Sequence, residues 1–228
     1  AIFAYSVSLS SVSGTTRYAA PGGLTTGLCP ITAPCTIARA SSFGDSVQLR
    51  GGVYTNTKLS LTLVGTAAQP IVIESYPGEA AILDGGGATL IADTDSIMRL
   101  QGSKYVTVRN ITFQNSGGRG LSVYAASNNA THHITIESVT VSHVGQRGIG
   151  GSGNDITIRD SFVEYAAEDN TTNGNGGGWA AGISSFTAND GTPARRWVIE
   201  NTSVQNIRGE CAIALRVIGI TFSNNTFS

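Results

Sequence analysis

Apolar residues recur in an eight-residue pattern through the C-terminal half of the chain. Residues 156–163 (ITIRDSFV) show it: apolar, small or β-branched, apolar, polar, Asn/Ser/Asp, any residue, Thr/Ser/Phe, apolar. The same pattern occurs at residues 106–113, 134–141, 197–204 and 220–227. Apolar and polar positions alternate on each side of the fifth residue, which predicts two strands joined by a tight turn.

The fifth position of the octads sets the repeat. Successive fifth residues are 28, 22, 41 and 23 positions apart, which suits a solenoid coil of about 22 residues with loop insertions. Equivalent residues of stacked coils lie about 4.8 Å apart, so an Asn side chain can hydrogen-bond its counterpart above and below. Antiparallel hairpins would not keep one polar residue at the same place, so we expect an all-β parallel β-helix. The ladder residues are Asn110, Ser138, Asp160, Asn201 and Asn224.

A third strand is predicted after each octad, at residues 120–124, 148–150, 182–186 and 212–216. Alternation assigns one set of side chains to the interior and the other to an outer face, which is the candidate working surface. The residues expected inside are Leu121, Val123, Ile149, Ile183, Ile213 and Leu215. Those expected outside are Ser122, Tyr124, Ser184, Phe186, Ala214 and Arg216.

The N-terminal part is expected to differ from the coils. Residues 1–11 alternate like a strand, and an irregular loop runs to about residue 35. Residues 36–43 predict a short helix, capped by Thr36 and ended by Gly44, that covers the first coil. We therefore expect residues 1–45 to form a strand, a loop and a capping helix, and residues 46–228 to form the coils of one elongated domain.

Composition adds three constraints. A net charge of −1 gives no electrostatic reason to expect nucleic acid or an anionic membrane, and no apolar run is long enough for a membrane span. Cys29 and Cys35 are either a small disulfide, which would suit an oxidising extracellular setting, or two unpaired thiols. Cys211 lies in an apolar alternating stretch and is expected to be a buried small hydrophobe.

The chain resembles a known superfamily in its N-terminal segments as well as in its octads. The segments are RYAAPGG at 17–23, PCTIARA at 34–40, GDSV at 44–47, GGVY at 51–54 and AQPIVIESYPGE at 68–79. They are similar to the right-handed parallel β-helix proteins of the pectate lyase-like superfamily, above all the secreted branch of alginate lyases, chondroitinase B and related pectate lyases. The resemblance implies a secreted protein that binds or acts on an acidic polysaccharide, by β-elimination if it is a lyase. The superfamily also holds hydrolases, epimerases, adhesins and structural proteins, so fold alone does not settle activity.

The resemblance implies that a sugar chain lies along one outer face and the loops before it. Counting nine residues past each ladder position gives Arg119, Arg147, Asp169 and Glu210 as a column of charges at the edge of that face. The longest insertion, residues 166–181, carries Trp179, which either stacks on a sugar ring or packs on the coil. The predicted substrate-binding residues are Trp179, Tyr124, Phe186 and Arg208.

Lyases of this kind neutralise a uronate carboxylate and remove a proton, with Ca²⁺ held by carboxylates and a Lys or Arg as base. The predicted metal ligands are Glu164, Glu168, Asp169 and Glu210. The predicted catalytic residues are Arg147, His143, Arg119 and Arg216.

The sequence departs from that pattern in two respects. Its two lysines, Lys58 and Lys104, fall outside the predicted central face, and no tight group of aspartates marks a calcium site. The arginines have an alternative role as structural ion pairs, and His143 has one as a turn residue.

A different class of function follows from the last octad. The sequence reaches Ser228 directly after it, which would expose an apolar cross-section and unpaired strand edges. The alternative is therefore an extracellular fibre in which β-helices associate head to tail through the uncapped C-terminal coil.

Overall fold

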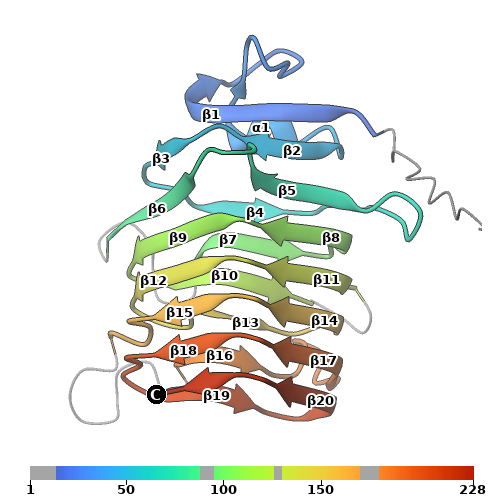
Figure 1. Ribbon diagram of the computed structural model, residues 1–228. Helices are drawn as coiled ribbons and strands as arrows, with labels where there is room; N and C mark the ends of the chain where they lie inside the picture. The colour runs from blue at the N-terminus through green and yellow to red at the C-terminus, as the bar shows by residue number, and fades with distance from the viewer. Residues whose placement is uncertain (1–13, 88–94, 126–129, 170–179) are drawn as a thin grey trace, which may run out of the picture.

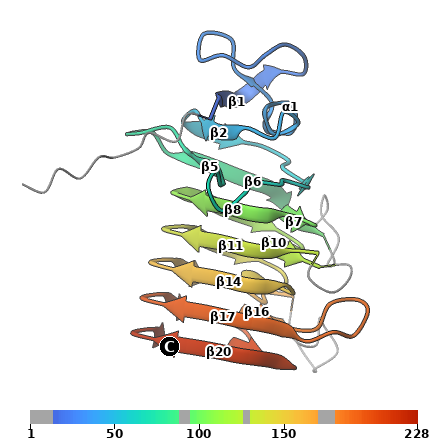
Figure 2. The same ribbon diagram turned by 90° about the vertical axis from the view of Figure 1, so that its right-hand side faces the viewer.

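Three parallel sheets wind into a right-handed β-helix (Figures 1 and 2). The structure is a computed structural model that describes residues 14–87, 95–125, 130–169 and 180–228. Each coil contributes one strand to each sheet, so strands that follow one another within a sheet come from successive coils. This arrangement confirms the predicted fold class.

From residue 106 onward, the strands of sheets A and B are those of the octads. Each octad begins on a strand of sheet A, turns at its fifth residue and continues on sheet B. Sheet A comprises β1 (Thr16–Leu24), β2 (Ser46–Leu49), β5 (Ile71–Ser75), β8 (Lys104–Arg109), β11 (His132–Glu137), β14 (Asn154–Arg159), β17 (Ala194–Glu200) and β20 (Val217–Ser223). Sheet B comprises β3 (Gly52–Tyr54), β6 (Ala81–Gly87), β9 (Ile111–Ser116), β12 (Thr140–Val144), β15 (Phe162–Glu164), β18 (Ser203–Gln205) and β21 (Thr226–Phe227).

Sheet C carries the predicted third strands and closes each coil. Its inward residues meet those of sheets A and B in one continuous apolar core. Leu121, Val123, Ile149 and Ile183 are buried, as predicted. Sheet C comprises β4 (Leu59–Leu61), β7 (Ser96–Gln101), β10 (Arg119–Tyr124), β13 (Ile149–Gly151), β16 (Ala181–Ser185) and β19 (Glu210–Ala214).

The ladder residues owe their identity mainly to backbone geometry. All five have a left-handed φ, between 49° and 56°, which Asn and Asp tolerate better than most residues. Their side chains were expected to bond from coil to coil, and the structure gives such a bond between Asn201 Nδ2 and Asp160 Oδ1, at 3.2 Å. Elsewhere backbone amides connect the coils at this turn, as in the bond from Ser138 N to Arg159 O at 3.1 Å.

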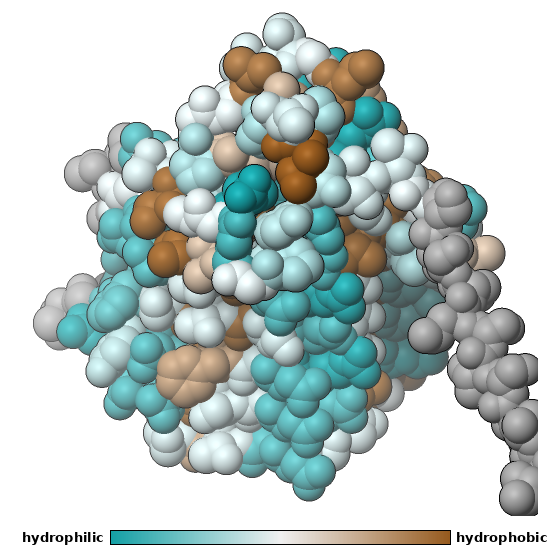
Figure 3. All heavy atoms as spheres, turned by 45° about the horizontal axis from the view of Figure 1, so that its top comes forward, coloured by the Kyte–Doolittle hydropathy of each residue, from teal (hydrophilic) through white to brown (hydrophobic). Residues whose placement is uncertain are grey.

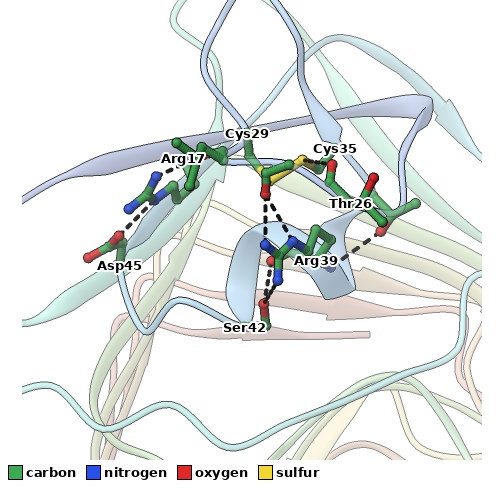
Figure 4. Close-up of a disulfide and its surroundings, with 10 residues drawn as sticks. Arg17, Thr26, Cys29, Cys35, Arg39, Ser42 and Asp45 are labelled. Atoms are coloured by element: carbon green, nitrogen blue, oxygen red, sulfur yellow. Dashed lines mark hydrogen bonds and ion pairs between the residues drawn. A yellow bond between two sulfur atoms is a disulfide. The ribbon is translucent and has the colours of Figure 1, made fainter.

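The N-terminal part agrees with the prediction for the helix and the disulfide. Helix α1 (Ile37–Ser41) begins after Thr36, whose hydroxyl accepts from Arg39 N at 3.2 Å. Cys29 and Cys35 form a disulfide, beneath which Arg39 donates to Gly27 O (Figure 4). Whether α1 acts as a cap stays a prediction.

The prediction of an irregular loop before residue 35 was wrong in part. Thr16–Leu24 form strand β1, which pairs with β2 as the first rung of sheet A. Pro21 lies within β1, at the edge of the sheet, where a residue without an N–H is tolerated. The strand predicted at residues 1–11 lies outside the described residues.

The inward and outward assignments in the last coil were wrong by one residue. Ala212, not Ile213, pairs with Ile183, and Leu215 follows β19 and is 37% exposed. Register follows the count from the ladder: Leu121, Ile149 and Ala212 each lie eleven residues after their ladder residue. The prediction placed Ile213, the larger apolar residue, inside, whereas the count places Ala212 there. Cys211 is half-buried against the core as a free thiol.

The two ends of the solenoid both present apolar side chains. Figure 3, in which the N-terminal end is tilted toward the viewer, shows separate brown hydrophobic residues there, and Leu24, Leu28 and Ile31 are exposed in that region. In the last coil Ile218 and Phe222 are exposed. Head-to-tail association stays a prediction. Among the described residues, no helix is long and apolar enough to cross a membrane.

Candidate functional site

The outer face of sheet C has a centre of small residues. Ser122, Gly150 and Ser184 lie side by side on β10, β13 and β16, and the two serines are 4% and 1% exposed. Ser122 Oγ lies 2.7 Å from Ser96 Oγ on β7. Larger polar and aromatic side chains at the two ends of these strands therefore determine what a ligand would meet.

Two arginines stand together at the start of this face. Because Leu121, Ile149 and Ile183 are in register, the residues two positions before them, Arg119, Arg147 and Ala181, occupy equivalent places. A bond of 3.0 Å from Gly120 N to Arg147 O connects the two arginine-bearing segments. The sequence thus placed both arginines correctly.

The rest of the predicted charge column needs a correction. Ala181, and not Asp169, occupies the third place. The insertion after β15 puts this place more than nine residues beyond the ladder residue Asp160. Glu210 takes the fourth place, in register with Ala181. The column is therefore Arg119, Arg147, Ala181 and Glu210, with its positive charge gathered on two neighbouring coils.

Two arginines at sheet C, Arg99 and Arg147, lie close to aromatic rings. The Arg147 guanidinium carbon lies 4.8 Å from the centroid of the Phe186 ring, and that of Arg99 lies 5.3 Å from the Tyr124 ring. Asn189 Nδ2 donates to the Tyr124 hydroxyl. Tyr124 and Phe186, predicted as substrate-binding residues, thus lie on the predicted face and each contacts an arginine.

The pKa of Arg147 is far below the ordinary value for an arginine. Burial, and then the positive charge of Arg119, lower the pKa of Arg147 to about 10. Its buried Nε has no hydrogen-bond partner in the part of the chain that the structure describes. A guanidinium that is desolvated in this way loses its proton more readily than an ordinary arginine does.

His143 lies near the end of strand β12 on sheet B, next to another predicted residue, Glu168. Its φ of 52° matches the left-handed φ of Asn115, Tyr165 and Asn206 in the neighbouring coils, and its ring stacks on Tyr165 at 4.7 Å. His143 Nδ1 lies 3.4 Å from Glu168 Oε1. This geometry agrees with the turn role, and the role as a base stays a prediction.

The predicted metal ligands lie in separate places. Glu164 projects from sheet B and accepts from Gln205 Nε2 at 3.5 Å, whereas Asp169 N donates to Gly145 O at 3.0 Å. Glu168 lies beside His143, and Glu210 begins β19 and is exposed. Across the described ranges, no three or more His, Cys, Asp or Glu residues are grouped so as to hold a metal ion.

These four carboxylates therefore do not form one cation site among themselves. The Ca²⁺ requirement implied by the resemblance stays a prediction. Calcium titration of the protein by calorimetry measures it directly.

The remaining predicted residues lie away from the two arginines or outside the described ranges. Arg208 Nη1 donates to Glu168 O at 3.2 Å, in the loops. The placement of Arg216 on the outer face was wrong: it follows β19 with a φ of 51°, in the turn toward β20. Its catalytic role stays a prediction. Trp179 lies outside the described residues.

Sequence reasoning missed Arg99 and Asn189. Arg99 lies on β7, in register with Ser122, and the alternation of Met98, Arg99, Leu100 and Gln101 is a strand signal that could have revealed it. Asn189 lies in the loop after β16, and nothing in its local sequence indicates that it meets a tyrosine 65 positions earlier.

Comparison with known proteins agrees with the geometry. The fold and the cationic, aromatic outer face define a pectate lyase-like β-helix. The family profile described as "Pel9A-like, right handed beta helix region" matches residues 17–203, and the chain belongs to this family.

Individual relatives match over smaller parts of their length. Pectate lyase PEL9 of Emericella nidulans is 35% identical over 102 residues, which are 40% of this chain and 25% of that protein. The alginate lyase of Paenibacillus sp. str. FPU-7 superposes with a TM-score of 0.64 at 18% identity, over 81% of this chain and 59% of that one. Pectate lyase Pel9A gives 0.61 at 16% identity, over 84% and 54%. The chain thus spans well under two thirds of each.

Proposed function

We propose that this protein is a secreted polysaccharide lyase that binds an acidic, uronate-containing polysaccharide across sheet C and cleaves it by β-elimination. The observation that carries the proposal is the adjacent pair Arg119 and Arg147, one of which is desolvated. Membership of the Pel9A-like family and the similarity to pectate lyase PEL9 support the reaction class. The disulfide is typical of proteins in an oxidising compartment and supports secretion.

The paired arginines suit a polyuronate. Two like charges on neighbouring coils repel each other, and a carboxylate placed between them relieves the repulsion while accepting directional hydrogen bonds. Coils are about 4.8 Å apart, a spacing comparable to one sugar unit of an extended chain. Arg119 thus binds and neutralises a carboxylate, which acidifies the proton on the neighbouring C5 atom of the sugar.

Arg147 then acts as the base. In its neutral form the guanidine accepts the C5 proton, the electron pair of the C–H bond forms the C4–C5 double bond, and the C4–O bond breaks. The leaving oxygen takes a proton from water. A pKa near 10 allows a larger neutral fraction at alkaline pH than the usual arginine value does.

The proposal is tested by following the ultraviolet absorbance of the unsaturated product from polygalacturonate and from alginate. We expect kcat/KM to rise with pH with an apparent pKa of about 10. Replacement of the base, Arg147→Gln, should reduce kcat/KM by roughly 100-fold or more, the usual range for loss of a general base.

Arg195→Gln is the matched control, because Arg195 is an exposed arginine on sheet A. It should leave the rate unchanged. Absence of product from both polymers, or equal rates for Arg147→Gln and the unmodified protein, would rule out this function.

A further inference from the structure

Sheet A carries a groove, on a different sheet from the proposed lyase site. Figure 2 shows the strands of this sheet, β5 to β20, stacked one below another. The groove has a volume of about 480 Å³ and runs across the strands, along the axis of the solenoid. It is lined by Pro70, Tyr105, Val106, Thr107, His133, Thr135, Asp155, Thr157, Arg196 and Val198.

The floor of the groove is a row of hydroxyl groups. Thr107, Thr135 and Thr157 are in register on β8, β11 and β14, with Val198 next on β17. All three threonines are half-buried, and their hydroxyls make no hydrogen bond within the described part of the chain. Hydroxyls that stand about 4.8 Å apart in a straight row are available to a linear ligand.

One side of the groove offers aromatic rings. Tyr105, His133, Asp155 and Arg196 occupy equivalent positions, all with φ between 52° and 56°, so the same local bend recurs on four coils. The Tyr105 ring stacks on His133 with centroids 4.5 Å apart. His132 lies edge-on to both rings.

The charges around the groove neutralise one another. Asp155 pairs with Arg196 and lies 3.7 Å from His133. Two residues beyond the threonines, Arg109 contacts Glu74 at 2.7 Å and Glu137 at 3.5 Å, and Arg159 also contacts Glu137. This side of the molecule therefore has little excess charge to attract a polyanion.

We infer that the sheet A groove binds a neutral, extended β-1,4-linked glycan whose chain lies along the solenoid axis. The faces of the sugar rings contact Tyr105. The sugar hydroxyls hydrogen-bond with the threonine row and with the Asp155–Arg196 pair. The site spans three steps between coils, roughly 14 Å, which limits recognition to a few consecutive sugar units. The inference does not depend on the proposed function, because it concerns another sheet and an uncharged ligand.

The test uses calorimetry with cellohexaose, xylohexaose and mannohexaose at pH 7. At least one should bind. Thr135→Val with Thr157→Val keeps the β-branched shape of the floor and removes two hydroxyls, and should weaken binding about tenfold or more. Thr112→Val with Thr140→Val makes the same change at two paired positions on sheet B and should leave affinity unchanged.

Melting temperatures of the two double variants show whether both remain folded. No binding of any hexasaccharide, equal affinity in the two double variants, or polygalacturonate binding that depends on Thr135 and Thr157 would overturn the inference. Arg147→Gln should leave hexasaccharide binding intact, so the two proposals fail separately.

Discussion

The ionisation of Arg147 is decided by a few neighbouring atoms. The guanidinium lies over the Phe186 ring, which attracts a cation but also keeps water away from it. Burial and the charge of Arg119 both disfavour the protonated form and together lower the pKa of Arg147 to about 10. Phe186 lies where it can keep water from the guanidinium, and we propose it as a positioning residue for the proposed base.

Replacing the Phe186 ring with a smaller aliphatic side chain tests whether the ring helps to lower the pKa of Arg147. Phe186→Leu removes part of the cover from Arg147, and water then stabilises its charged form. The alkaline limb of the pH dependence of kcat/KM should move above pH 10. Tyr124→Leu, which alters the ring beside Arg99, should not move it. An unchanged limb in Phe186→Leu would show that the ring does not control the ionisation.

The site was predictable at the residue scale only where counting along the chain is reliable. Arg119 and Arg147 lie nine residues after their ladder residues with no insertion between, so the sequence placed them. The predicted place of Asp169 was wrong because residues 165–180 lengthen the connection between β15 and β16. The contact of Arg147 with Phe186 joins two coils and depends on side-chain directions that periodicity does not specify.

At the scale of the elements, the corner between sheets B and C restricts residue size. A Cβ atom added at Gly148 would lie 2.5 Å from Val163 Cγ1 and 2.6 Å from Gly182 O, and Gly120 meets Val141 and Gly148 in the same way. Neither neighbour can withdraw, because one fills the core and the other belongs to the next coil. The glycine permits sheet C to approach sheet B closely.

Gly148→Ala should therefore destabilise the fold by about 1–3 kcal/mol, the usual cost of overpacking a core. The free energy of unfolding from denaturant titration measures the loss. Gly14→Ala is a suitable control, since nothing lies within 4 Å of the added atom. Equal stabilities of the two variants would contradict the steric explanation.

The elements also differ in how far the sequence revealed them. The octads predicted sheets A and B because both strands and the left-handed turn lie within eight residues. Sheet C was found in part: β10 and β16 carry clear alternation, whereas β7 was missed and β19 was misaligned. In β19 the inward position holds Ala212, which gives too little apolar signal to fix the register, whereas β7 does carry the alternation of Met98 and Leu100.

For the whole molecule, the ion pairs on sheet A connect one coil to the next. Burial opposes ionisation of Glu137, but hydrogen bonds and charge from Arg159 and Arg109 outweigh it and lower its pKa. A hydrogen bond from Arg196 also lowers the pKa of Asp155, against the effect of burial. Both carboxylates thus bind protons more weakly in the folded chain than in the unfolded one.

Acid should weaken the fold for this reason. The stabilisation is fully present above the ordinary carboxylate pKa of about 4 and is lost as pH falls through the lowered values. Denaturant unfolding between pH 7 and pH 3 should show decreasing stability below about pH 4.5. Glu137→Gln should flatten that decrease. A free energy of unfolding that stays constant down to pH 3 would contradict the role of these pairs.

The connection between β15 and β16 shows how this architecture can change over evolutionary time. Residues 165–180 separate β15 from β16 in the sequence, yet Ile183 still pairs with Ile149 and Val204 still pairs with Val163. Each coil contacts only its neighbours, so added length leaves the register of other coils unaltered. Natural selection, or a protein engineer, can therefore exchange such segments to alter ligand preference while the inherited scaffold continues to fold.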